Sequence, residues 1–268
     1  MGPDRPLITL TTDFGFSDGT IGALIGVIKS LCPEAEVVVS AADIPRHDIP
    51  RGAWALLQAA PFFPARAIHV AVVDPGVGSR RRPVMAMTSH GTFIGPDNGL
   101  LSWAVRAAGP ICWIALENPA YRIAKVGVTF DGRDLFAPTA AYLARGVDPA
   151  DIGPEIQDPS NLPWPEPAPG PESIEGEILV VDAFGNLITN IPAALAKTTL
   201  GSDAFVAHIP GGPDAPLSRS YSDITGALGL VANGSGLLEV AAFQRSAAEL
   251  SGLDRGAKVT VTAGGRQK

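Results

Sequence analysis

The sequence predicts an α/β fold of two domains, in which a mostly parallel α/β sandwich is followed by a smaller antiparallel β-barrel. Strand-like and helix-like segments alternate from residue 7 to about residue 153, as they do in parallel sheets covered by helices. A proline-rich stretch then interrupts the pattern, and short β-like runs separated by glycine and asparagine turns follow it. We therefore expect an α/β domain over 1–156, a linker over 157–173 and a β-domain over 174–268.

The amino-terminal elements are expected in a regular order. Apolar, β-branched runs without helical spacing predict strands, and the run at 67–73 has the character of a buried parallel strand. Two helices should end where proline follows, at Pro33 and Pro61. In chain order we expect strand 7–11, helix 19–31, strand 36–39, helix 51–60, strands 67–73, 84–87 and 92–94, helix 99–107, strand 111–116 and helix 138–144.

The carboxy-terminal part has a different texture. The segment 158–171 is too rich in proline for a helix or a central strand, so we expect a semi-rigid connector there. Short strands at close spacing indicate a small antiparallel barrel or sandwich, and the barrel is our prediction. These strands are expected at 176–181, 187–189, 205–209, 228–231, 238–242 and 257–262.

Composition limits the classes of partner. The chain of 268 residues has a formal net charge of −7 and no basic stripe, which argues against nucleic acid because that binding depends on neutralising phosphates. No apolar run approaches the roughly 20 residues that span a bilayer, and Met1 to Pro6 lack the layout of a signal peptide. We expect a soluble, cytoplasmic protein that binds neither nucleic acid nor membrane.

The cysteines and histidines do not form a metal-binding pattern. Cys32 and Cys112 have no neighbour at ligand spacing, and two cysteines in a chain of this length do not make a disulfide framework. The histidines are scattered without a His-x-x-x-His pair. We expect reduced cysteines and no metal site.

The segment 72–81 is the most informative one for function. Asp74 comes directly after the apolar strand and begins a turn that contains Gly76 and Gly78. Arg80 and Arg81 follow this turn closely in the sequence. Ligands of open α/β sheets bind beyond the carboxyl ends of the strands, so Asp74 is expected where chemistry usually occurs. The alternative is a tight surface turn with solvated arginines.

The first strand leads into a similar glycine-containing loop over 11–20. A carboxylate such as Asp13 can accept hydrogen bonds from two ribose hydroxyls. Either Asp18 or Thr20 is expected to cap the helix that follows. Neither a dinucleotide-binding glycine fingerprint nor a P-loop is present.

Four further glycine-containing turns carry polar side chains. Taken singly, each fits a structural role as a helix cap, a packed loop or a hairpin. The turn at 182–190 can also stack a base on Phe184 and read its edge through Asn186. The other three turns cover 95–101, 129–138 and 233–236.

Taken together and in this order, these motifs resemble those of the SAM hydroxide adenosyltransferases. This family is the SAM hydrolase branch of the superfamily that includes the SAM-dependent fluorinase and chlorinase. The resemblance extends from Leu7 to about Val261. It is carried by Thr12-Asp13-Phe14-Gly15, Val73-Asp74-Pro75-Gly76-Val77-Gly78, Pro96-Asp97-Asn98-Gly99-Leu100-Leu101, Gly132-Arg133-Asp134, and Phe184-Gly185-Asn186 with Thr189-Asn190.

The resemblance implies a homotrimer with substrate sites between subunits, where SAM is the substrate and no cofactor is needed. Water would attack the 5′ carbon of the ribose, releasing adenosine and methionine. By the same resemblance the catalytic positions are Asp74, Arg81 and Asp131. The binding positions would be Asp13 for the ribose, Asp18, Thr20, Asp182 and Ser235 for methionine, and Phe184 and Asn186 for adenine.

The chain departs from the family pattern at two positions. Asp131 stands where the family usually has histidine, and Ala42 stands where a second histidine is common. Asp74 occupies a position that is usually tyrosine in the halogenases, which favours water over halide as the nucleophile. The alternatives are a halide-using adenosyltransferase and a non-catalytic protein that binds SAM or adenosine.

Overall fold

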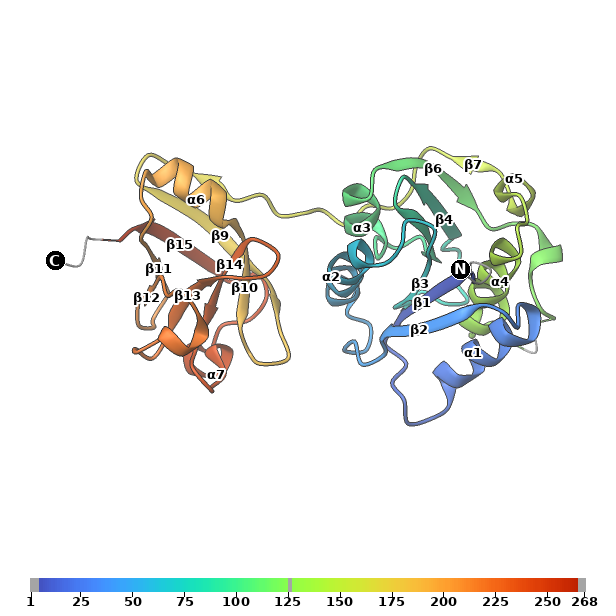
Figure 1. Ribbon diagram of the computed structural model, residues 1–268, viewed down its shortest axis with the longest axis horizontal. Coiled ribbons are helices and arrows are strands. Elements are labelled where there is room, and N and C mark those ends of the chain that lie inside the picture. The colour runs from blue at the N-terminus through green and yellow to red at the C-terminus, as the bar shows by residue number, and fades with distance from the viewer. Residues whose placement is uncertain (1–4, 125–126, 265–268) are drawn as a thin grey trace. The chain divides into compact units, whose positions relative to one another are not determined.

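The computed structural model describes residues 5–124 and 127–264, and the chain forms two compact units, Met1–Pro163 and Trp164–Lys268 (Figure 1). The predictions that concern Met1 to Asp4 lie outside the described residues. Within the described part of the chain, no helix has both the length and the apolar character needed to cross a bilayer.

The amino-terminal unit is built on a seven-stranded mixed sheet. Its first four strands in spatial order are parallel neighbours, and the last three pair in antiparallel fashion. The order is β2 (Glu36–Ala41), β1 (Leu7–Thr12), β3 (Ile68–Val72), β5 (Gly91–Pro96), β4 (Pro83–Thr88), β6 (Pro110–Ala115) and β7 (Glu155–Ile156). The predicted α/β class with a mostly parallel sheet is confirmed.

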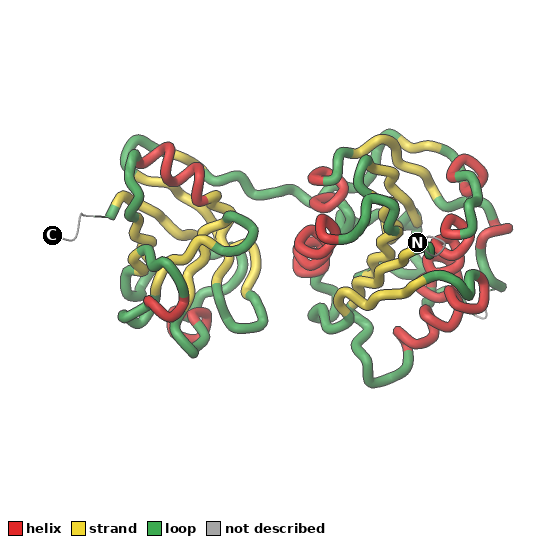
Figure 2. Tube along the Cα trace, in the orientation of Figure 1, coloured by secondary structure: helices red, strands yellow, loops and turns green. Residues whose placement is uncertain are grey.

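Helices cover both faces of this sheet, as the tube view shows (Figure 2). Along β3 and the residue after it, the side chains alternate between two cores. Val70 and Val72 pack with α1 (Thr20–Leu31) and α4 (Ala137–Ala144), whereas Ala71 and Val73 pack with α2 (Ile49–Ala59) and α3 (Ser102–Ala107). The helices are α1 (Thr20–Leu31), α2 (Ile49–Ala59), η1 (Ala60–Phe62), α3 (Ser102–Ala107), η2 (Pro119–Tyr121), the π-helix η3 (Gly132–Phe136), α4 (Ala137–Ala144) and α5 (Pro149–Ile152). The central strand is therefore buried on both sides.

Local capping explains where the predicted helix boundaries shift. α2 begins at Ile49, earlier than the predicted residue 51, because Asp48 Oδ1 accepts a hydrogen bond from the Arg51 backbone N–H at 3.1 Å. α3 begins later than predicted, since Gly99 has a φ of 92° and turns the chain before the helix starts. The helix predicted at 138–144 is preceded by the π-helix turn η3, which the sequence did not indicate.

The carboxy-terminal unit is an antiparallel sheet that curls into a nearly closed barrel. A backbone bridge from Leu217, which follows β12, to Leu230 of β13 brings the two ends of the sheet together. The order is β12 (Ala215–Pro216), β11 (Phe205–His208), β15 (Lys258–Ala263), β9 (Ser173–Val181), β10 (Leu187–Pro192), β14 (Leu237–Ala241) and β13 (Gly229–Ala232), with β8 (Ala168–Pro169) beside β9. α6 (Ala193–Leu200), η4 (Tyr221–Asp223) and α7 (Ala247–Ser251) complete the unit. The predicted barrel is confirmed.

The first part of the proline-rich segment is anchored to the amino-terminal unit. Arg82 Nη1 donates to Asp158 Oδ1 at 2.8 Å, and Asp97 Oδ1 accepts from the Ser160 backbone N–H at 2.6 Å. Arg82 and Asp97 also pair with each other at 2.8 Å. The chain is thus held in place as it leaves this unit.

Candidate functional site

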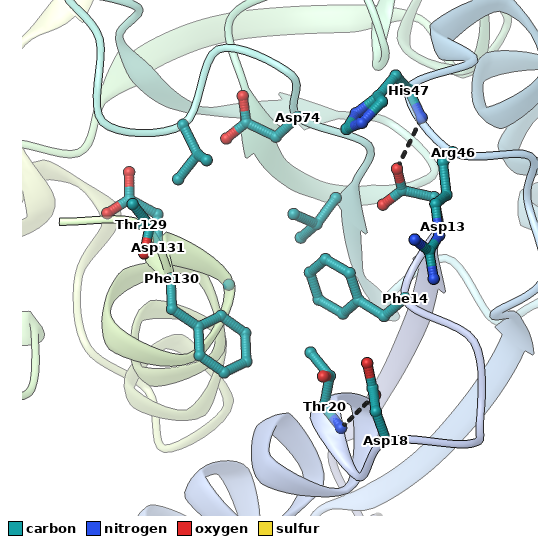
Figure 3. A pocket seen from close by; sticks show the side chains of 13 residues that line it. Asp13, Phe14, Asp18, Thr20, Arg46, His47, Asp74, Thr129, Phe130 and Asp131 are labelled. Carbon is teal, nitrogen blue, oxygen red and sulfur yellow. Dashed lines mark hydrogen bonds between the residues drawn. The ribbon is translucent and has the colours of Figure 1, made fainter. Parts of the chain in front are cut away.

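The amino-terminal pocket lies at the carboxyl ends of neighbouring parallel strands. Thr12, the last residue of β1, is in register with Val72, the last residue of β3, so the carboxylates of Asp13 and Asp74 emerge at one edge of the sheet. Figure 3 shows their side chains around this pocket, whose volume is about 480 Å³. It is lined by Asp13, Phe14, Asp18, Thr20, Arg46, His47, Val72, Asp74, Val77, Thr129, Phe130, Asp131 and Gly132.

Arg81 joins the two carboxylates that were predicted to lie beside it. Its Nη2 is 2.5 Å from Asp74 Oδ2 and 2.7 Å from Asp131 Oδ2, and its Nε lies 3.0 and 2.9 Å from the two oxygens of Asp74. All three side chains are at most 10% exposed. The structure therefore brings the three predicted catalytic residues together.

The turn after β3 places Arg81 for these contacts. The backbone N–H of Val77 donates to the Asp74 carbonyl, and Gly78 takes a φ of 79°, which reverses the chain. The Arg81 guanidinium also lies over the Phe136 ring, with its Cζ 5.4 Å from the ring centroid. Arg81 is fixed by its own turn and by η3.

The electrostatic balance of this cluster is negative. Burial alone would lower the pKa of Arg81, but hydrogen bonds and charge from Asp74 and Asp131 raise it overall, so the guanidinium stays charged. By formal charge, one arginine and two aspartates carry one net negative charge. Such a pocket suits a small cationic reactant.

Asp13 is held at the opposite side of the pocket from Asp131 (Figure 3). Its Oδ2 accepts a hydrogen bond from the backbone N–H of His47 at 2.9 Å. His47 has a φ of 66°, a left-handed conformation that is uncommon for residues other than glycine and that tends to occur at functional sites. Asp13 Oδ1 has no hydrogen-bond partner among the described residues and remains available to a ligand.

Asp18 and Thr20 mark the start of α1. The N-cap residue of α1 is Gly19, so neither Asp18 nor Thr20 takes the capping position expected for one of them. Asp18, one residue earlier, accepts at its Oδ1 from the Thr20 backbone N–H at 3.0 Å. Hydrogen bonds from Thr20 lower the pKa of the Asp18 carboxyl below its usual value. Both residues also line the pocket, so they can contact a ligand there.

A second pocket, of about 610 Å³, lies in the carboxy-terminal unit. Asp182 organises its turn: Oδ1 accepts from the backbone N–H groups of Phe184 and Asn186, and Oδ2 accepts from Asn186 Nδ2 at 2.9 Å. The Phe184 ring is 80% exposed and free to stack on a flat ligand. The lining residues are Asp182, Phe184, Asn186, Tyr221, Ala242, Phe243, Gln244, Arg245 and Ser246.

Ser235 is the one predicted binding residue outside these two lining sets. It is exposed in the turn between β13 and β14, where its backbone N–H donates to Asn233 Oδ1 at 2.9 Å. Its predicted role at the methionine carboxylate stays a prediction.

Sequence reasoning missed several lining residues. Arg46 and His47 follow the second strand, so the rule that ligands bind beyond strand ends could have drawn attention to them. Tyr221 and the run from Phe243 to Arg245 carry no comparable signal, because only the closing of the barrel brings them to the turn of Phe184.

The fold and the sites define a class of protein: a two-domain α/β and β-barrel chain with an acidic pocket at the strand ends. The chain belongs to the SAM hydroxide adenosyltransferase family, whose N-terminal domain matches residues 8–153 and whose C-terminal domain matches residues 176–260.

Relatives match over nearly the whole chain. The (R)-S-adenosyl-L-methionine hydrolase of Salinispora arenicola is 40% identical, covering 97% of this chain and 98% of its own. The enzyme of the same name from Thermus thermophilus is 38% identical, with 95% and 98% covered. A fluorinase of an Actinoplanes species is more distant, at 26% identity with 96% and 98% covered.

Solved structures agree with the fold. An uncharacterized conserved protein from Thermotoga maritima superposes with a TM-score of 0.88 at 27% identity, covering 96% of this chain and 99% of its own. A conserved hypothetical protein from Thermus thermophilus gives a TM-score of 0.78 at 36% identity, with 97% and 100% covered.

Proposed function

We propose that this protein hydrolyses S-adenosyl-L-methionine to adenosine and L-methionine by attack of water on the ribose 5′ carbon. The observation that carries the proposal is the full-length identity of about 40% to a relative named as an (R)-S-adenosyl-L-methionine hydrolase. The name of that relative specifies the sulfonium epimer, and we propose the (R)-epimer as the preferred substrate here.

Hydrolysis of SAM needs little catalytic assistance for the departure of methionine. A sulfonium leaves readily as a neutral thioether, so no acid is needed to expel methionine. Water is a weak nucleophile, and the site must orient it in line with the carbon–sulfur bond and accept its proton. The residues of the cluster around Arg81 are suited to both tasks.

We assign the handling of water to Asp74, Arg81 and Asp131. Arg81 uses Nε and Nη2 for the two carboxylates, and its Nη1 has no hydrogen-bond partner among the described residues. That N–H group can donate to the attacking oxygen and stabilise its hydroxide-like character. One of the two carboxylates takes the proton, and Asp131 does so in place of the histidine usual in the family.

Substrate binding is assigned to residues of both units. Asp13 would hold the ribose hydroxyls through its available oxygen, and Phe184 and Asn186 would contact adenine. Asp18, Thr20, Asp182 and Ser235 would meet the methionine end. We propose that the protein is a cytoplasmic homotrimer in which the site is completed between subunits.

Incubation with separate (R)- and (S)-epimers of SAM in heavy-oxygen water tests this function. We expect adenosine carrying the oxygen label in its 5′ hydroxyl, formed faster from the (R)-epimer. Formation of 5′-halo-adenosine in the presence of chloride or fluoride would instead support a halide-using enzyme. Tight binding of SAM without any nucleoside product would contradict hydrolysis altogether.

A further inference from the structure

A buried carboxylate is hydrogen-bonded to a residue that lines the carboxy-terminal pocket. Glu239 lies in β14 and is only 2% exposed, which is unusual for a carboxylate side chain. Tyr221 Oη donates to its Oε1 at 2.5 Å, and Asn233 Nδ2 donates to its Oε2 at 3.0 Å. Each carboxylate oxygen therefore has its own partner, and the partners come from two separate segments.

The two partners lead to two functional parts of the unit. Tyr221 lines the pocket together with Phe184 and Phe243. Asn233 Oδ1 accepts from the backbone N–H groups of Ser235 at 2.9 Å and Leu237 at 3.1 Å, which fixes the turn that carries Ser235. One carboxylate thus connects an aromatic wall of the pocket to the Ser235 turn.

The carboxyl of Glu239 and the hydroxyl of Tyr221 both have raised pKa values. Burial raises the pKa of Glu239, whereas the hydrogen bonds from Tyr221 and Asn233 oppose that rise. The bond to Glu239, together with burial, raises the pKa of Tyr221 to about 12, so its hydroxyl remains a donor at neutral pH. A buried carboxylate is costly unless it is hydrogen-bonded, which makes these contacts obligatory.

We propose that Glu239 is a positioning residue that holds the Tyr221 ring as a wall for the nucleoside base and, through Asn233, sets the turn of Ser235. This inference rests on the proposed function, since it takes the pocket of Phe184 to hold the base of the substrate. Glu239 itself does not line the pocket and acts only through its two partners.

Calorimetric adenosine binding and SAM kinetics on the full chain test the proposal. In Glu239→Gln a single amide oxygen replaces two acceptors, and Tyr221→Phe keeps the ring but removes the tether. We expect each change to weaken adenosine binding by about tenfold, the loss typical of one hydrogen bond to a charged group. The KM for SAM should rise to match in Tyr221→Phe and rise further in Glu239→Gln, which also weakens the contact with Asn233. The double variant should lose no more than either single variant, because the two residues act as one unit.

Glu177→Gln is the matched control. Glu177 is another barrel glutamate, paired with Lys258 at 2.5 Å and absent from the pocket lining, so its adenosine affinity should equal that of the wild type. The proposal is overturned if Glu239→Gln behaves like this control, or if the two single losses multiply in the double variant. Should Glu239→Gln fail to fold, unchanged affinity in Tyr221→Phe overturns it.

Measuring adenosine binding and SAM turnover on the same protein allows the role of Glu239 and the proposed hydrolysis to fail separately. A wild type that binds adenosine but does not cleave SAM would contradict hydrolysis, and the adenosine affinities would still decide the role of Glu239. A wild type that cleaves SAM but binds no adenosine would overturn the role of Glu239 and leave hydrolysis standing.

Discussion

Replacing Asp131 by alanine removes one of the two carboxylates that Arg81 holds in the amino-terminal pocket. Asp131 accepts from Arg81 Nη2 at 2.7 Å and is 7% exposed, while Asp74 keeps its own contacts with the guanidinium. If Asp131 takes the proton of the attacking water, adenosine formation should fall by about 100-fold or more, as expected for loss of a general base. That factor corresponds to roughly 2.7 kcal/mol on the activation barrier.

A matched control exists one residue along the chain from Arg81. Arg82 pairs with Asp97, which is 9% exposed and lies outside the pocket lining. Both Asp131→Ala and Asp97→Ala remove a buried carboxylate from an arginine that keeps a second acidic partner, so both should destabilise the fold by about 1–3 kcal/mol, the cost of leaving a donor unsatisfied. Only Asp131→Ala should lose the rate.

The assay is single-turnover formation of adenosine, with thermal unfolding measured on the same samples. Asp131→Asn adds a sharper distinction, because an amide retains a hydrogen-bond acceptor for Arg81 but cannot take a proton at neutral pH. It should be nearly as slow as Asp131→Ala. Wild-type-like turnover in either variant, or an equal loss of rate in Asp97→Ala, would refute the role of Asp131 as base.

Three further predictions concern stability and binding. Arg81→Met removes the cation that Asp74 and Asp131 share, so urea titration should show a loss of about 3–5 kcal/mol in the free energy of unfolding; an unchanged free energy of unfolding would contradict this. Burial, followed by the charge of a neighbouring histidine, lowers the pKa of His69 to about 4 in the fold, so its contribution is complete above the unfolded value of 6.5 and falls by up to roughly 3 kcal/mol as pH drops towards 4. His69→Gln should flatten that slope in unfolding measurements. Gly185→Ala would place a methyl carbon 2.1 Å from Ser246 Oγ at a φ of 81° and should abolish adenosine binding in calorimetry, whereas Gly15→Ala, with a φ of 72° and open space, should cost only about 1 kcal/mol of strain.

The sheet of the amino-terminal unit could be predicted because its signals are local. The run at 67–73 is apolar and β-branched, and it became β3, buried on both faces. The helices α6 and α7 were not predicted, because each is short and lies between strands without a clear apolar period. The π-helix η3 was also missed, since nothing in Gly132 to Phe136 distinguishes it from a packed loop.

The candidate site was predictable only in part. That Asp13 and Asp74 lie at one sheet edge follows from the parallel pairing of their strands. The left-handed residue His47, by contrast, donates its backbone N–H to the Asp13 carboxylate, a contact between residues far apart in sequence that no local pattern could reveal. The partners of Glu239 likewise meet only when the barrel forms, so no periodic pattern could reveal them.

The charge arrangement of the amino-terminal pocket limits how it can accelerate the reaction. A sulfonium loses its positive charge as the carbon–sulfur bond breaks, so carboxylates placed close to sulfur would stabilise the bound substrate more than the transition state. Asp74 and Asp131 avoid this penalty only if they face the attacking water, where a proton is released as the new bond forms. In the proposed mechanism, pairing both with Arg81 serves that end, because the guanidinium offsets one carboxylate and its Nη1 would donate to the incoming oxygen. A neutral histidine at position 131, as is usual in the family, would leave the cluster with Asp74 and Arg81 uncharged by formal charge. Asp131 instead gives the cluster one net negative charge, which would attract the cationic substrate.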